Sequence, residues 1–198
     1  MRLFVALDID EAIQLRLDDY IRTLEPRVPG VRFVRSSNYH VTLKFLGELS
    51  SLREVAERLR LVRYPSFGMN VRGVGFFPNA RAPRVFWAGV DAPQVSGLAR
   101  GVDEALGTLG FPTEKEFHPH LTLARNGSGR PRPVRGERPP EAFAQLSKYV
   151  ASSPAPEFGT MAAREFFLYE SRLAPGGASY VKLETFTLTA APPEVDKR

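Results

Sequence analysis

Three histidines are the first residues to consider, because imidazole is the side chain that titrates closest to neutral pH. They are His40, His118 and His120. Two of them begin the same pattern, His-x-Thr-Leu, at positions 40–43 and 120–123. A single copy would carry little information, because threonine is common in strands and a lone histidine is usually structural. Two copies that use two of the three histidines indicate that the motifs act together.

Both motifs lie in segments with the alternating, β-branched pattern that is typical of strands. Because positions i and i+2 of a strand face the same side, His40 and Thr42 should project together, as should His120 and Thr122. If both strands face one cleft, one imidazole can act as a base and the other as an acid. The two hydroxyls can donate hydrogen bonds to phosphate oxygens. This chemistry requires neither a thiol nor a metal.

The composition narrows the class of protein. A chain of 198 residues, of which 43% are hydrophobic and 25% charged, fits one globular domain or one compact body with two lobes. The sequence contains no cysteine, which excludes disulfide frameworks, cysteine zinc sites, iron–sulfur clusters and thiol nucleophiles. No apolar run reaches the roughly 18 residues of a membrane span, so we expect a cytoplasmic chain without membrane contact. The net charge of +5 is compatible with a polyanionic partner.

Hydrophobic periodicity predicts an alternation of strands and helices. Helices are expected at 11–25, 51–64, 93–109 and 139–151, the first of them capped by Asp8 or Asp10. Strands are expected at 3–7, 31–34, 39–46, 67–77, 84–90, 118–125, 158–169 and 179–189. These strands are too few and too hairpin-like for a doubly wound parallel sheet, so the fold class should be α+β, with helices outside and sheets inside. The repeated motif suggests an internal duplication.

Three features outside the motifs bear on the site. Residues 126–140 are rich in Gly, Pro and Arg and predict a basic loop, which is either a flap over a phosphate-bearing ligand or a solvated surface loop. Trp87 is expected in the core. Lys44 either lines the cleft beside Thr42 or is exposed at the end of its strand.

The motifs and the segments around them resemble the 2H phosphoesterase superfamily, which is named for two His-x-Thr/Ser-x motifs. Within it, the chain is most similar to the bacterial and archaeal RNA 2′,3′-cyclic phosphodiesterases, also known as 2′-5′ RNA ligases. The resemblance covers nearly the whole chain, and the matching segments follow the family's order. These segments are residues 2–7, 40–48, 117–125 and 168–173.

The resemblance implies one domain, 1–198, with a bilobal fold and pseudo-twofold symmetry. Two antiparallel sheets then line a central cleft, helices lie outside, and each lobe supplies one motif. The resemblance also implies that the partner is an RNA 3′ end or a nucleotide with a 2′,3′-cyclic phosphate, which is opened to a 2′-phosphate. It implies no metal and no cofactor. One cleft already holds both motifs, so we expect a monomer.

The resemblance further assigns roles to the motif residues. His120 is the general base that activates water, and His40 is the general acid that protonates the departing O3′. Thr42 and Thr122 bind the phosphate oxygens. The two repeats are nearly symmetric, so the residues alone do not decide which histidine is the acid.

Four more residues are candidates around the motifs. Arg125 is expected to bind the phosphate, although strict alternation would turn it away from the motif face unless the strand ends or bulges first. Phe45 and Phe4 are candidates for stacking on a terminal base, with core packing favoured for Phe4. His118 is expected to support the second motif.

Other functions stay open from the residues alone. His40, His118 and His120 could be metal ligands in a metal-dependent hydrolase, although Pro119 and the lack of acidic residues in the motifs disfavour this. The protein could also be a non-catalytic RNA- or nucleotide-binding module, because a fold alone does not fix a function. Within the superfamily, 2′-5′ ligation would use the same four motif residues.

Overall fold

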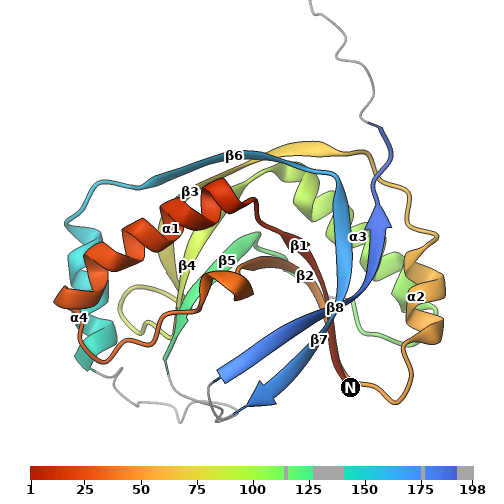
Figure 1. Cartoon of the computed structure of the whole chain (residues 1–198), viewed down its shortest axis with the longest axis horizontal. Helices are drawn as coiled ribbons and strands as arrows, with labels where there is room; N and C mark the ends of the chain where they lie inside the picture. The colour runs from red at the N-terminus through yellow and green to blue at the C-terminus, as the bar shows by residue number, and fades with distance from the viewer. Residues whose placement is uncertain (114–115, 127–140, 175–176, 191–198) are drawn as a thin grey trace, which may run out of the picture.

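The computed structural model describes residues 1–113, 116–126, 141–174 and 177–190. Within them, strands form one curved antiparallel sheet in the order β6-β3-β4-β5-β2-β1-β7-β8 (Figure 1). The strands are β1 (Arg2–Asp8), β2 (His40–Glu48), β3 (Phe67–Phe77), β4 (Val85–Asp91), β5 (His120–Arg125), β6 (Glu157–Ala163), β7 (Glu165–Ala174) and β8 (Gly177–Thr187). The α-helices are α1 (Glu11–Leu24), α2 (Arg53–Leu59), α3 (Pro93–Gly107) and α4 (Glu141–Ala151). The α+β class is confirmed.

The sheet consists of two halves that each end in a motif strand. One half is β6-β3-β4-β5 and the other is β2-β1-β7-β8. They are joined in the middle by a single residue pair, Val41 with Leu121, so the two expected sheets are continuous. These two residues follow the histidine in each motif, and an approximate twofold axis therefore passes between them. The pairing of β2 with β5 thus brings the two motifs side by side.

The main core lies between the sheet and the helices that cover one of its faces. Helix α1 buries Ile13, Leu17, Ile21 and Leu24, whose spacing of three or four residues forms one apolar face. Helix α3 packs in the same way through Val95, Leu98, Val102 and Leu106. A second, small cluster lies apart from this core and contains Phe4, Ala6, Phe167 and Tyr169. These residues alternate with core residues along β1 and β7, so the small cluster occupies the opposite face of the sheet.

Several expected boundaries are wrong. Residues 31–34 form no strand, because only Phe33 makes a bridge, to Ala124. The strand expected at 158–169 is two strands, β6 and β7, separated at Arg164. Helix α2 ends at Leu59, short of residue 64. The basic loop predicted at 126–140 lies outside the described residues except for Asn126.

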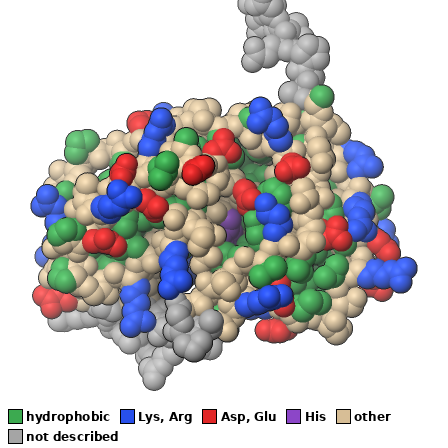
Figure 2. Space-filling model, in the orientation of Figure 1, with side chains coloured by type: hydrophobic (Ala, Val, Ile, Leu, Met, Phe, Trp, Pro, Cys, Tyr) green, Lys and Arg blue, Asp and Glu red, His purple; other side chains and the backbone are tan. Residues whose placement is uncertain are grey.

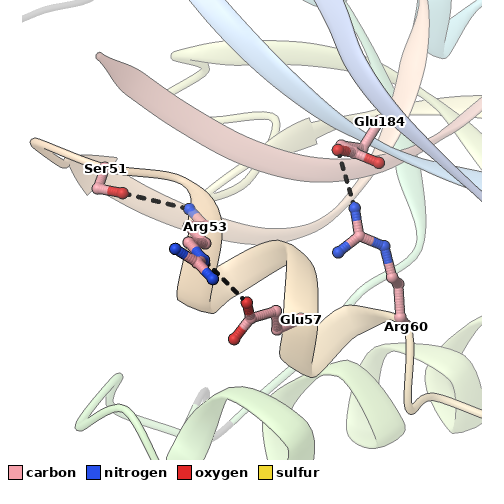
Figure 3. A network of polar contacts seen from close by, with 5 residues as sticks. All are labelled: Ser51, Arg53, Glu57, Arg60 and Glu184. Carbon is pink, nitrogen blue, oxygen red and sulfur yellow. Dashed lines mark hydrogen bonds and ion pairs between the residues drawn. The ribbon is translucent and has the colours of Figure 1, made fainter.

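Two surface ion pairs lie in and beside α2. Arg53 pairs with Glu57 along the helix at 3.1 Å, and its backbone N–H donates to Ser51 Oγ (Figure 3). Arg60, just after the helix, pairs with Glu184 of β8 at 3.0 Å. Exposed pairs of this kind contribute at most about 1 kcal/mol each. Among the described residues, no helix is long and apolar enough to cross a membrane.

Candidate active site

His40 and His120 begin β2 and β5, and their rings are fixed in the same way. In each ring, Nδ1 lies 2.7 Å from the backbone carbonyl oxygen two residues earlier, that of Asn38 or of His118. A carbonyl can only accept, so Nδ1 carries the proton and Nε2 of the neutral ring keeps its lone pair. Two equivalent nitrogens are therefore left for acid–base chemistry. Figure 2 shows a histidine surface recessed near the centre of the face in view.

Thr42 and Leu43 of the first motif and His120 of the second line one cavity of about 240 Å³, whereas His40 lines a separate pocket of about 90 Å³. The walls of the larger cavity also include the rings of Phe45, Phe77 and Phe117. His40 lies close enough to His120 and Arg125 to feel their charges. The pairing of β2 with β5 thus puts the two motifs side by side, with Arg125 bonded to the hydroxyl of Thr122 and an apolar wall beside His120.

Arg125 lies on the motif face because β5 contains a bulge. The register between β4 and β5 shifts so that Leu123 has no partner of its own. Leu123 and Ala124 are both buried, and the next side chain returns to the face of Thr122. The Arg125 guanidinium donates a hydrogen bond to Thr122 Oγ1 at 3.2 Å. Strict alternation does not hold at this point of the strand.

Strand β2 has the equivalent bulge at Leu43. Leu43 and Lys44 are consecutive buried residues, and Phe45 turns to the motif face with 58% of its surface exposed. Phe4, in contrast, is only 3% exposed, because it packs against the His40 ring at a centroid distance of 4.9 Å and lies under two tyrosines. Of the two candidates for base stacking, Phe45 is therefore the accessible one.

Lys44 neither lines the cleft nor is exposed, contrary to both expectations. Its side chain is 2% exposed and crosses to α3, where it forms an ion pair with Asp103. Its ammonium also donates to the backbone carbonyl of Pro112 at 2.8 Å. The bulge explains this placement, because it turns Lys44 to the core side. The buried pair fastens the first motif strand to the helix behind it.

Trp87 is not a core residue. Its neighbours Phe86 and Ala88 are buried in the core, so Trp87 faces the other side of β4, opposite Thr122. The indole is partly buried and lies 5.2 Å from the ring of Phe77. Trp87 thus lies on the same face of the sheet as Thr122. His118, whose carbonyl orients His120, has an exposed ring.

The half of the sheet that contains β2 has a polar network that the sequence did not reveal. Asp8 is the strand partner of His40 and lies at the end of β1 rather than capping α1. It accepts hydrogen bonds from the Tyr169 hydroxyl and from Lys182 Nζ, the latter at 2.7 Å. Asp10 is the residue at the helix cap, without a side-chain bond. The position of Asp8 beside His40 follows from the pairing of β1 with β2, and strand pairing is not a local property of the sequence.

Burial lowers the pKa of both motif histidines. For His40 it lowers the pKa to about 4, with Arg125 and His120 acting in the same direction and the Asn38 carbonyl and Asp8 opposing it. Burial also lowers the pKa of His120, reinforced by Arg125 and His118 and opposed by the hydrogen bond to the His118 carbonyl. Both rings are therefore neutral in the free protein at neutral pH. An anion bound between them would raise both pKa values.

The histidines do not form a metal centre with acidic neighbours. Across the described residues, no group of three or more His, Cys, Asp or Glu side chains is arranged to hold a metal ion. The alternative ligand set of His40, His118 and His120 therefore finds no support in the geometry.

Comparisons with known proteins identify the family of the chain. A family model described as LigT like phosphoesterase matches residues 7–87 and 90–180. The chain is 39% identical to the RNA 2′,3′-cyclic phosphodiesterase of Archaeoglobus fulgidus, over 94% of this chain and 99% of that one. A Thermus thermophilus structure, TT0787, superposes with a TM-score of 0.76 at 31% identity, covering 96% of this chain and 99% of that one. The structure of Escherichia coli LigT complexed with 3′-AMP superposes with a TM-score of 0.72 at 28% identity, covering 95% of this chain and 98% of that one.

The family match spans both motifs and includes Asp8 at one end and Tyr180 at the other. The sequence similarity extends over nearly the whole chain, and the structural similarity extends over it as well. The chain belongs to the LigT-like phosphoesterase family of the 2H superfamily.

Proposed function

We propose that this protein opens 2′,3′-cyclic phosphates at RNA 3′ ends to 2′-phosphates, without a metal or a cofactor. The single observation that carries the proposal is the matched placement of the two motifs: β2 and β5 pair and put the motifs side by side, and each imidazole is held by Nδ1 on a backbone carbonyl. Support comes from the curated relatives, which are named RNA 2′,3′-cyclic phosphodiesterases.

The proposed step needs two proton transfers on opposite sides of the phosphorus. His120 Nε2 takes a proton from water as the water oxygen bonds to phosphorus. The bond between phosphorus and O3′ breaks, and protonated His40 gives its proton to O3′. The products are a 2′-phosphate and a free 3′-hydroxyl. His120 is left protonated and His40 neutral, and proton exchange with solvent restores the starting state.

The other residues of the site stabilise charge and hold the nucleotide. Thr42, Thr122 and Arg125 donate hydrogen bonds to the phosphate oxygens, where negative charge develops in the transition state. Phe45 is exposed at the cavity wall and stacks on the terminal base. The same groups would serve 2′-5′ ligation, in which a 5′-hydroxyl replaces water as the nucleophile that attacks the cyclic phosphate. We further propose a single domain of two lobes that acts as a cytoplasmic monomer.

The direct test is hydrolysis of an oligoribonucleotide that ends in a 2′,3′-cyclic phosphate, in excess EDTA. The expected product is the 2′-phosphate alone, identified by ³¹P NMR. His40→Ala and His120→Ala should each lose about 10²- to 10⁴-fold in rate, because each removes one acid or base. Activity that disappears with EDTA and returns with a divalent metal would contradict the mechanism, as would near-normal rates in either variant.

A further inference from the structure

The two motif histidines differ in the residue that lies across from them in the sheet. Strand β1 places Asp8 opposite His40, whereas β4 places Gly89 opposite His120. A Cβ atom at position 89 would lie 2.7 Å from the backbone carbonyl oxygen of Arg72, so a side chain does not fit there without a shift of the backbone. Among the described residues, a carboxylate therefore lies across the sheet from His40 and none lies across from His120; the Glu116 carboxylate lines the cavity of His120 but pairs with His118.

Donors from the two neighbouring strands orient this carboxylate. The Tyr169 hydroxyl of β7 and Lys182 Nζ of β8 both donate to Asp8. Lys182 Nζ also lies 3.6 Å above the ring of Phe167, which restricts where the ammonium can move. Burial and the contact with Asp8 raise the pKa of Tyr169, so its phenol stays protonated and keeps donating. The carboxylate is therefore held in one place relative to His40.

The charges around the two rings are correspondingly unequal. His40 faces Arg125 and His120 from β5, which disfavour its protonated form, and Asp8 from β1, which favours it. Tyr180 of β8 contacts the His40 ring by its edge, at 5.0 Å between centroids. On His120, the charges of Arg125 and His118 both disfavour protonation, and Glu116, which lines the same cavity, pairs with His118 at 3.9 Å. Among the described residues, Asp8 is the carboxylate whose charge favours protonation of a motif histidine, and that histidine is His40.

We propose that Asp8, oriented by Tyr169 and Lys182, is a positioning residue that keeps His40 protonated in the substrate complex and so makes it the acid. His120, opposite Gly89, is then left as the base. This inference rests on the proposed function, and it removes the ambiguity that the near-identical motifs leave. Burial outweighs Asp8 in the free protein, so the effect belongs to the complex, in which the bound phosphodiester adds its own negative charge.

The experiment is the pH dependence of kcat for the wild type, Asp8→Asn and Lys182→Gln, since kcat reports the ionisations of the bound complex. In Asp8→Asn the alkaline limb, which reports the acid, should move to lower pH by roughly one unit, and the acidic limb should stay. Lys182→Gln removes the cation beside the carboxylate, while the Tyr169 hydroxyl still bonds to Asp8 and holds it in place, so the alkaline limb of this variant should move to higher pH. Glu170→Gln is the matched control, because Glu170 pairs with Arg172 from the opposite side of β7.

A uniform fall in kcat with both limbs fixed would mean that Asp8 only supports the fold, and would overturn the inference. A shift of the acidic limb, or shifts of the same sign in both variants, would also overturn it. A second readout does not depend on turnover: NMR titration of the three histidines in enzyme saturated with inorganic phosphate. There Asp8→Asn should lower the pKa of His40 and leave that of His120 unchanged. If the wild type has no cyclic phosphodiesterase activity, the proposed function alone is refuted. If the pKa of His40 is the same in Asp8→Asn and the wild type, the role of Asp8 is refuted.

Discussion

At the scale of single residues, His40 combines a fixed tautomer with an unfavourable environment for its charge. Its Nδ1 is committed to the Asn38 carbonyl, and burial among aromatic rings lowers its pKa to about 4. The ring therefore gains a proton readily only when a negative charge arrives. This is a suitable property for an acid that is needed in the substrate complex and nowhere else.

The same burial should make stability depend on pH. An unfolded histidine titrates near 6.5, so below this pH the unfolded chain binds a proton that folded His40 does not bind until about pH 4. The contribution of His40 to stability is fully present above about pH 6.5 and is lost as the pH falls toward 4. From pH 7 to pH 5 the loss should be about 2 kcal/mol.

Urea unfolding at both pH values measures this effect. Between pH 7 and pH 5, the free energy of unfolding of His40→Gln should fall by about 2 kcal/mol less than that of the wild type. His118→Gln is the control, because its ring is exposed, and it should follow the wild type. Equal losses in the wild type and His40→Gln would show that the folded protein does not resist protonation of this ring.

The motif hydroxyls should have smaller effects than the histidines. Thr42→Ala and Thr122→Ala each remove one hydrogen bond to a charged phosphate, worth about 1.5–3 kcal/mol, or about 10- to 150-fold in kcat/KM. Steady-state kinetics on the cyclic-phosphate substrate checks this. Thr→Ser variants, which keep the hydroxyl, should restore most of the rate. A full loss in the Ala variants that Ser does not restore would indicate a packing role.

At the scale of elements, the two bulges determine which side chains reach the cleft. Alternation predicted the shared face of His40 and Thr42 correctly, because the period of two is a local property of a strand. It could not place Phe45 or Arg125, because a bulge is a property of two paired strands. The bulge also sends Lys44 to the core, where its partner comes from α3, nearly 60 residues along the chain.

The Lys44–Asp103 pair should be important for stability. Asp103→Leu leaves a buried ammonium without its carboxylate and should cost about 3–5 kcal/mol in the free energy of unfolding. Lys44→Met should also be destabilising. The double variant should cost clearly less than the sum of the two single variants, since it leaves no uncompensated charge. Chemical denaturation of the four proteins measures the coupling, and strict additivity would show that the pair contributes nothing.

At the scale of the whole molecule, an internally repeated fold performs a reaction that is not symmetric. The repeat, the α+β class and the two motifs could be predicted from the sequence, because each depends on local patterns. Three features could not: the pairing of Asp8 with His40, since Asp8 and Asp10 are equally suitable as the helix cap; the place of Trp87 on the face of Thr122, because strand aromatics are usually buried; and the break at Arg164, which has no turn signal. All three depend on which strands pair.

The central claim is that one histidine protonates the leaving group while the other activates water. The most direct measurement compares His40→Ala and His120→Ala on the cyclic phosphate and on an analogue with sulfur in place of the bridging 3′ oxygen. A thiolate leaves without protonation, so the analogue should restore His40→Ala by at least about tenfold relative to the oxygen substrate and leave His120→Ala impaired. Restoration of His120→Ala instead would reverse the roles, and restoration of neither would contradict general acid catalysis by His40.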